Sequence, residues 1–298
     1  MEQYDITKYL KEATMLDFRP EIQVYIQKTE PIWYEKAKDL RCALHEVFSR
    51  TNKPKIIELC DAHDSNPYHL FFYMIARFYF FDSGDNIIYY LYKKENLSYF
   101  TRTALESLPK RFIRETTVRD THEYIEMPGC GWRRDSIDDK WIYSYVRDLY
   151  KDIWINTKQE TGKYSYISRN KVDRRSIENE DEMHESLKNI GFSIYYLENL
   201  TFAEQIKLFR SSKIITGLHG AGLTHLIFCE PGTYIYEING YTDKNHYAHL
   251  SKECNLHYTR FTKVNDIHDG NETNNIDCEA YIASLKDLVN LCSSSRGA

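Results

Sequence analysis

Residues 217–224, Gly-Leu-His-Gly-Ala-Gly-Leu-Thr, place one histidine among three glycines directly after an apolar run. Glycine allows the backbone to turn with positive φ and to approach a ligand closely. Where a helix begins, its free amides carry about half a positive charge and attract anions. The stretch therefore favours an anion-binding turn between a strand and a helix; the alternative is a tight structural turn whose histidine is bonded within the protein. The residues of this candidate anion site are Leu218, His219, Gly220, Ala221, Gly222, Leu223 and Thr224.

Basic side chains gather after another predicted strand, where Ser168 and Arg169 are followed by Arg174 and Arg175. Guanidinium groups bind phosphate through paired hydrogen bonds. These residues therefore add to the candidate anion site, unless they form an ordinary solvated loop. Glu237 ends a further predicted strand, and its carboxylate can accept two hydrogen bonds from the hydroxyls of a ribose. The alternative for Glu237 is a capping or surface role.

In the first half of the chain, acidic and imidazole side chains surround the turn 61–67. Such side chains in a cleft serve as general bases, although Asp, Asn and Pro favour turns for conformational reasons alone. The sequence shows no Cys/His zinc spacing and no carboxylate pair at metal-ligand spacing. The candidate bases are Asp61, Asp64 and His69, with His63 behind them.

The elements that must position these residues are clearest after residue 163, where strand and helix patterns alternate five times. Such alternation predicts an α/β fold with a parallel sheet and helices on both faces. Ligands of these sheets bind outside the carboxyl ends of the strands, and the polar residues above fall at those ends, as do Glu198 and Asn199. The predicted strands are 163–168, 192–198, 213–218, 233–238 and 256–261, and the predicted helices are 178–190, 202–209, 221–228, 243–254 and 278–292.

Two local signals fix helix ends in this half: Gly191 predicts a C-terminal cap, and Thr201 with Glu204 predicts a capping box. The first half is less regular. There we expect strands at 53–60, 86–92 and shortly after residue 122, and a polar linker at 156–163. The expected helices lie in the first 50 residues, at 68–81, at 102–112 and at 136–154.

Length and composition restrict the class of protein. A chain of 298 residues predicts two domains, expected at 1–157 and 158–298, with the last helix as a candidate to pack back on the first. A net charge of −5 gives no indication of nucleic-acid binding. Seven scattered cysteines, a charged N-terminal stretch and the lack of a long apolar run favour a reducing, cytoplasmic setting without a signal peptide or membrane anchor.

Three blocks, taken in order, resemble glycosyltransferase family 61. They are the Ser-Arg stretch 166–182, the central stretch 200–238 with His219 to Thr224 and Glu237, and the helix-and-strand stretch 246–258. The family includes xylosyltransferases, arabinosyltransferases and O-linked N-acetylglucosaminyltransferases. The resemblance implies a GT-B fold, in which two Rossmann-like domains face a cleft. It implies an inverting, metal-independent transfer of a sugar from a nucleotide-sugar, usually a UDP-sugar, to a glycan or protein acceptor.

The first half resembles the family in its Asn-x-x-His element at 66–69, but Tyr73 stands where the family commonly has an acid. An acid from that helix is therefore not the base in this chain. The lack of a membrane anchor departs from the eukaryotic secretory relatives and suggests either a bacterial or viral cytoplasmic enzyme or a shortened chain. One alternative stays open, a catalytically idle nucleotide-binding or scaffold protein that keeps the donor-site motif. A weaker alternative is another Rossmann enzyme, such as a methyltransferase, against which the separate upstream half argues. The sugar, the acceptor, a homodimer and the identity of the base are not determined by the sequence.

Overall fold

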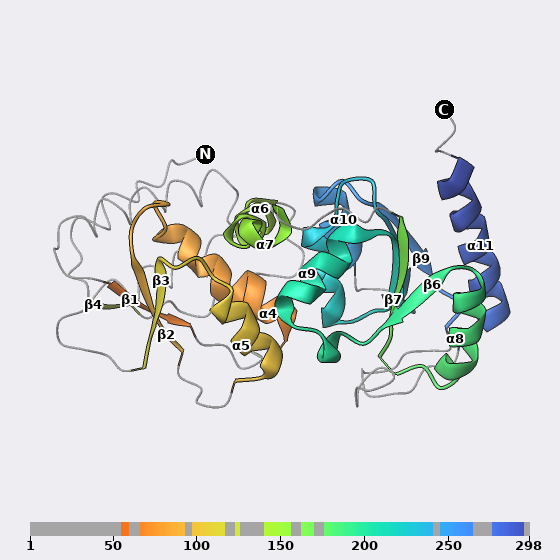
Figure 1. Ribbon diagram of the computed structural model, residues 1–298, viewed down its shortest axis with the longest axis horizontal. Coiled ribbons are helices and arrows are strands. Elements are labelled where there is room, and N and C mark those ends of the chain that lie inside the picture. The colour runs from red at the N-terminus through yellow and green to blue at the C-terminus, as the bar shows by residue number, and fades with distance from the viewer. Residues whose placement is uncertain are drawn as a thin grey trace, which may run out of the picture. The chain divides into compact units, whose positions relative to one another are not determined.

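The structure is a computed structural model, and the chain divides into two compact α/β units, Met1–Lys151 and Asp152–Ala298 (Figure 1). No helix in the described parts is both long enough and apolar enough to cross a lipid bilayer. The residues that the structure describes are 55–59, 66–92, 97–116, 123–125, 140–155, 162–169, 176–240, 245–264 and 276–294.

The described part of the first unit contains a parallel sheet of four strands in the order β3-β2-β1-β4. The chain therefore moves outward from β1 to β3 and then returns to pair β4 on the other side of β1. The carboxyl ends of β1 and β4 form the point where the strand order reverses, which is where sheets of this kind bind ligands. The strands are β1 (Lys55–Leu59), β2 (Ile88–Tyr92), β3 (Phe112–Glu115) and β4 (Glu123–Ile125).

The aromatic segment predicted as a helix over 68–81 is helical from Pro67 to Phe80, but in three different geometries. Asn66 caps its start, because the Asn66 Oδ1 accepts a hydrogen bond of 2.9 Å from the amide of Tyr68. The segment is buried on almost every side, as its sequence of apolar and aromatic residues requires. Its parts are the α-helical turn α4 (Pro67–His69), the π-helical η1 (Leu70–Met74) and the 3₁₀-helical η2 (Ile75–Phe80).

Other helices of the first unit pack on this segment through aromatic edges; Phe72, for example, contacts Tyr143 with ring centroids 4.9 Å apart.

Strand β3 was not predicted from the sequence. It has four residues, and Ile113 and Arg114 in its middle are exposed, so neither length nor alternation marks it. The helices are α5 (Tyr99–Glu106), α6 (Lys140–Leu149) and α7 (Lys151–Ile155), the last of which crosses the boundary between the units.

The second unit confirms the predicted alternation of strands and helices. Its described residues form a parallel sheet of five strands in the order β6-β5-β7-β8-β9. The chain moves from β5 to one neighbour and then crosses to the other side, so the strand order reverses between β5 and β7. The strands are β5 (Lys163–Ile167), β6 (Phe192–Tyr195), β7 (Ser212–Leu218), β8 (Tyr234–Ile238) and β9 (His257–Phe261).

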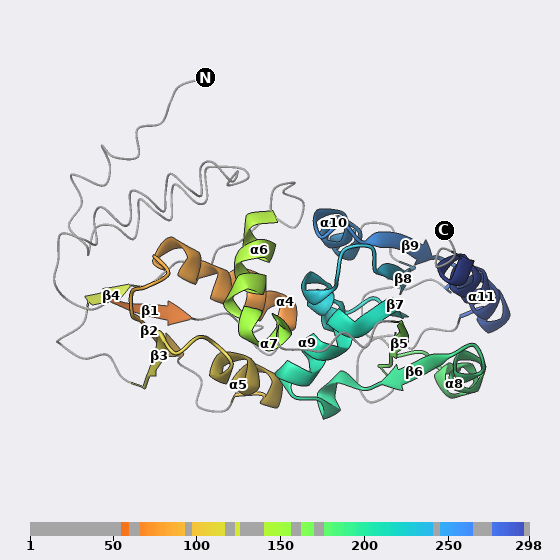
Figure 2. The same cartoon turned by 45° about the horizontal axis from the view of Figure 1, so that its top comes forward.

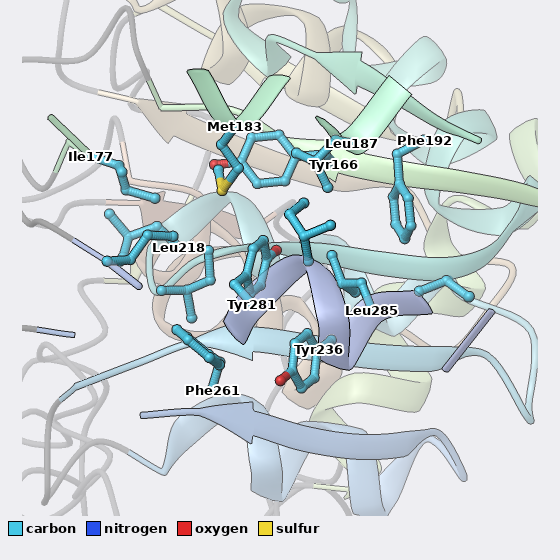
Figure 3. Packing of buried hydrophobic residues seen from close by; sticks show 14 of the residues in the cluster. Tyr166, Ile177, Met183, Leu187, Phe192, Leu218, Tyr236, Phe261, Tyr281 and Leu285 are labelled. Carbon is cyan, nitrogen blue, oxygen red and sulfur yellow. The ribbon is translucent and has the colours of Figure 1, made fainter. Parts of the chain in front are cut away.

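Helices cover both faces of this sheet, with α8 and α11 on one side of the strands and α9 and α10 on the other (Figure 2). On the α8/α11 side, Tyr166, Leu218 and Tyr281 are among the side chains of one buried cluster (Figure 3). Helix α11 thus packs on the sheet of its own unit. The helices are α8 (Glu180–Asn189), η3 (Leu197–Asn199), α9 (Phe202–Ser211), η4 (Ala221–Phe228), α10 (His246–Glu253) and α11 (Cys278–Ser294).

Both predicted helix-end signals are confirmed: Gly191 has φ +91° after α8, and Thr201 with Glu204 forms a capping box at α9. The prediction that Glu198 and Asn199 end a strand is wrong. Strand β6 stops at Tyr195, and both residues lie in the 3₁₀ turn η3. The side-chain amide of Gln205 donates to the carbonyl of Leu197 at 2.9 Å and to the carbonyl of Leu200 at 3.1 Å. These two hydrogen bonds stabilise the turn against an extended conformation.

Candidate functional site

The carboxyl ends of β5 and β7 lie side by side, with Ile167 paired to Gly217. A Cβ on Gly217 would lie only 2.7 Å from the backbone oxygen of Ile167, so only glycine lets the two strands approach this closely. Ser168 is buried just beyond β5, and its amide donates to the carbonyl of Tyr195 at 2.9 Å. Where the strand order reverses, the backbones of β5 and β7 are therefore in close contact.

Arg169 extends from this point to the glycine turn that follows β7. A Cβ added to Gly220 would lie 2.9 Å from the guanidinium carbon of Arg169 and closer still to one of its nitrogens. The guanidinium group therefore rests directly on the backbone of Gly220. The amide of Arg169 donates to Glu180 Oε1 at 3.2 Å, and the Tyr166 hydroxyl donates to the same oxygen at 2.8 Å. Two predicted ligands from separate motifs, Arg169 and Gly220, thus meet.

Helix η4 begins directly after Gly220, and no side chain caps it. Its first hydrogen bond runs from the amide of Leu223 to the carbonyl of Gly220 at 3.0 Å. The amides of the first helical turn have no partner within a helix, and in η4 this turn begins at Ala221, next to the glycine on which Arg169 rests. A guanidinium group and a helix N-terminus are consequently combined at one strand edge, which is a suitable arrangement for a phosphate group.

Other residues of the glycine stretch are buried rather than presented to a ligand. The side chain of Leu218 belongs to the core cluster, and those of Leu223 and Thr224 are also buried, so any contact from these three would come from their backbone. His225 is fully buried, its Nδ1 bonds to the carbonyl of Gly222 at 3.0 Å, and burial lowers its pKa to about 4. His225 is therefore a neutral part of the core.

His219 is bound to the neighbouring strands. Its Nδ1 lies 2.5 Å from Glu237 Oε1, and the two residues are 4% and 1% exposed. The hydroxyl of Tyr258 donates to the other oxygen of the Glu237 carboxylate. The pKa of Tyr258 is raised, mainly by burial and in second place by the negative charge of Glu237. The Tyr258 hydroxyl therefore keeps its proton. Both oxygens of Glu237 are thus bonded within the protein, and its predicted contact with a ribose stays a prediction.

The family described as Glycosyltransferase 61 matches residues 43–236, more than half of the chain. The chain belongs to glycosyltransferase family 61. The matched range contains β1 to β7, the glycine turn and most of β8, so membership rests on both units.

Individual relatives match over shorter stretches. The EGF domain-specific O-linked N-acetylglucosamine transferase of Gallus gallus is 32% identical over 101 residues, which are 32% of this chain and 19% of the relative. The enzyme of that name from Drosophila melanogaster is 28% identical over 142 residues, which are 45% of this chain and 27% of the relative. Xylan glycosyltransferase MUCI21 of Arabidopsis thaliana is 33% identical over 94 residues, which are 29% of this chain and 19% of the relative. The matched stretches span roughly a fifth to a quarter of these longer family 61 proteins.

In this family 61 chain, several predicted site residues lie outside the described residues, namely Asp61, His63, Asp64, Arg174 and Arg175. The candidate base His69 is described. It ends α4, and its ring meets that of Tyr73 edge-on, with centroids 4.8 Å apart. The residue that replaces the family's acid therefore packs on the histidine of the same element.

Two supporting residues of the site, buried Glu180 and partly buried Tyr258, were missed from the sequence. Glu180 orients Arg169 through its amide, and Tyr258 holds the carboxylate of Glu237. The first opens a predicted helix and the second lies in a predicted strand, but they stand 11 and 21 residues from their partners. The packing of α8 against β5 brings Glu180 to Arg169, and the pairing of β8 with β9 brings Tyr258 to Glu237, so no local pattern of the sequence showed these contacts.

Proposed function

We propose that this protein is an inverting glycosyltransferase of GT-B type that moves a sugar from a nucleotide-sugar, a UDP-sugar in the first instance, to a hydroxyl of a glycan or protein acceptor. One observation carries the proposal: the guanidinium group of Arg169 rests on Gly220, at the point of strand reversal, in a chain of glycosyltransferase family 61. The GT-B arrangement, in which the two units face a cleft, is part of the proposal.

In this proposal the diphosphate of the donor contacts Arg169, His219 and the amides that follow Gly220, while Arg174 and Arg175 extend the basic surface. Cleavage of the bond to the sugar leaves its electron pair on the departing diphosphate and adds one negative charge to it, and fixed donors in a protected site stabilise such charge without rearranging. The arginines and the start of η4 supply these donors, and the proposed reaction requires no metal ion. In the described parts of the chain, no three His, Cys, Asp or Glu side chains gather in a metal-binding arrangement.

The catalytic base is proposed to come from the first unit. Inversion requires a base that takes the proton of the acceptor hydroxyl on the face opposite to the leaving diphosphate. Asp61 and Asp64 follow β1 in the chain, and the order of the first sheet reverses at the carboxyl end of this strand. A general base contributes about 10²- to 10⁴-fold to turnover. Replacing the base should therefore lower turnover by that factor with unchanged UDP affinity. The variants to compare are Asp61→Asn, Asp64→Asn and His69→Gln; near-native turnover in all three would show that the base lies elsewhere.

The relatives suggest where the search for substrates should begin. Their names state the transfer of N-acetylglucosamine to EGF domains and the glycosylation of xylan. For this chain we propose an acceptor of the same broad kind, a hydroxyl of a glycan or of a polypeptide. Membership of a family of transferases does not favour the alternative of an idle nucleotide-binding scaffold.

The proposal is tested first by nucleotide binding and then by chemistry. Thermal stability is measured with UDP, GDP, CDP and a panel of UDP-sugars; UDP should raise the melting temperature, because a ligand that binds only the folded state stabilises it. Consumption of the selected UDP-sugar is then followed with and without EDTA, and the anomeric configuration of the product is read by NMR. No stabilisation by any nucleotide, or a product of retained configuration, would refute the proposal.

A further inference from the structure

The buried contacts of His219 suggest a role for Glu237 and Tyr258, which are linked to its imidazole ring by hydrogen bonds. The imidazole ring is held by Glu237 on one edge, and the ring of Tyr247 lies against it with centroids 5.2 Å apart. His246 is close by, with a centroid distance of 6.2 Å. A ring enclosed in this way has one orientation, so its two nitrogens have different surroundings.

His219 Nδ1 and Glu237 Oε1 are 2.5 Å apart, and since an ionised carboxylate can only accept a hydrogen bond, we take Nδ1–H as the donor. The amide nitrogen of Asn239 lies farther away, 3.3 Å from the same Nδ1. Since Tyr258 donates to the second oxygen of Glu237, the carboxylate is free to accept from the imidazole. These contacts assign the proton to Nδ1. They turn Nε2 to the opposite side of the ring, away from Glu237.

The support behind the carboxylate is itself fixed. Arg260 Nε donates to the Tyr258 hydroxyl oxygen at 3.5 Å, and the guanidinium group of Arg260 also donates to Asn245 Oδ1 at 2.6 Å. Asn245 directly precedes α10, the helix that carries Tyr247. A continuous series of hydrogen bonds therefore extends from the start of α10 through β9 and β8 to His219. Such outer contacts are typical of side chains that hold a ligand-binding histidine in one orientation.

We propose that Glu237 and Tyr258 are positioning residues, which hold His219 with its Nδ1–H on the carboxylate so that Nε2–H donates to the diphosphate of the donor. The role rests on the proposed function, because it takes the diphosphate as the ligand. The carboxylate balances the positive charge of an imidazolium, whose second N–H then meets a phosphate oxygen. Glu237 thereby acts on the phosphate end of the nucleotide through His219, and not on the ribose by direct contact.

Comparison of three ligands separates these two roles. UDP has both phosphates and ribose hydroxyls, uridine lacks the phosphates, and 2′,3′-dideoxy-UDP lacks the hydroxyls. The positioning role predicts that Glu237→Gln weakens UDP and dideoxy-UDP alike, by about 10-fold or more, and leaves uridine unchanged. Tyr258→Phe should weaken UDP by about 2- to 10-fold. Tyr234→Phe, a matched control on β8 whose ring stacks on His257, should have no effect.

A double-mutant cycle and a spectroscopic measurement complete the test. In a His219→Asn background, Glu237→Gln should cause no further loss of UDP affinity, because its effect passes through the imidazole. Imidazole ¹⁵N spectra, with the His219 signals assigned by their loss in His219→Asn, should show protonated Nδ1 in the free protein. Saturation with UDP should give protons on both nitrogens.

Several results would overturn the proposal. Equal loss of UDP and uridine in Glu237→Gln, with dideoxy-UDP unaffected, would make Glu237 a ribose ligand. Equal loss of all three would make its role structural. If Glu237→Gln does not fold, Tyr258→Phe and the wild-type spectra still decide. Wild-type protein that binds UDP but lacks a proton on Nδ1 would refute the positioning alone. Protein that shows this proton but binds no nucleotide would refute the proposed function, and the diphosphate contact with it.

Discussion

Replacing Gly220 by alanine should weaken nucleotide binding by displacing Arg169 and without unfolding the protein. The backbone at Gly220 has φ 176° and ψ 165°, an extended conformation that alanine adopts without strain. The added methyl carbon would lie 2.9 Å from the guanidinium carbon of Arg169, which must withdraw by at least about 0.5 Å to reach ordinary contact at 3.4 Å. Because this group is the far end of a flexible side chain, it can move at little cost in stability.

The expected loss of affinity follows from the contact that Arg169 can no longer make. A hydrogen bond to a charged group contributes about 1.5–3 kcal/mol, which corresponds to roughly a 10- to 150-fold change in Kd. Titration calorimetry with UDP should show a loss in this range for Gly220→Ala and a similar loss for Arg169→Ala. Tyr234→Phe on β8, whose ring stacks on His257, is the control and should leave UDP affinity unchanged.

The decisive measurement is the double variant. If the methyl group acts through Arg169, then Gly220→Ala in an Arg169→Ala background should change UDP affinity by no more than about twofold. An equal loss in both backgrounds would show that the methyl group obstructs the ligand or the fold directly. That result would refute the assignment of Arg169 as the displaced contact. The melting temperatures of all variants must remain close to that of the wild type for this comparison.

Three predictions concern stability, and urea unfolding checks each. Asp82 is buried; burial tends to raise its pKa, but its bonds to Arg111 and other donors lower it overall. Asp82→Asn should therefore cost about 1.5–3 kcal/mol at pH 7, and the difference should shrink below about pH 4; a constant difference would contradict this. The lowered pKa of His225 predicts that stability falls by about 3 kcal/mol between about pH 6.5 and 4, and that His225→Phe flattens this slope. Thr201→Ala should lose about 1 kcal/mol with the capping box to Glu204, and Thr201→Ser should keep most of it.

The second unit was largely predictable, because its signals are local. Gly191 and the capping box at Thr201 mark helix ends within four residues of sequence, and alternating strands and helices predict a parallel sheet. The order of the strands has no such local signal. The sequence placed Arg169 and His219 at strand ends, but only the observed pairing of β5 with β7 makes these two ends neighbours.

Contacts between neighbouring strands could not be predicted either, because they depend on the strand order. Glu237 was predicted to face a ligand because it ends a strand, and nothing near it in the chain indicates that Tyr258 and His219 occupy both of its oxygens. In the first unit, exposed residues in β3 concealed a strand at the edge of the sheet. Tyr73 was recognised as a replacement, but its packing against His69 depends on helical geometry that residue types do not specify.

The packing of α11 has a consequence for synthesis of the chain on the ribosome. Thr216 of β7 forms hydrogen bonds to the hydroxyl of Tyr281 and to the carbonyl of Tyr236, and Lys213 donates to the carbonyl of Cys292 at 2.5 Å. The strands emerge first, and the helix that covers one face of them emerges last. Until then the growing chain exposes a broad apolar surface, the usual starting point of aggregation. Chains that stop before residue 278 should therefore accumulate as insoluble protein even though they contain all the strands that the structure describes.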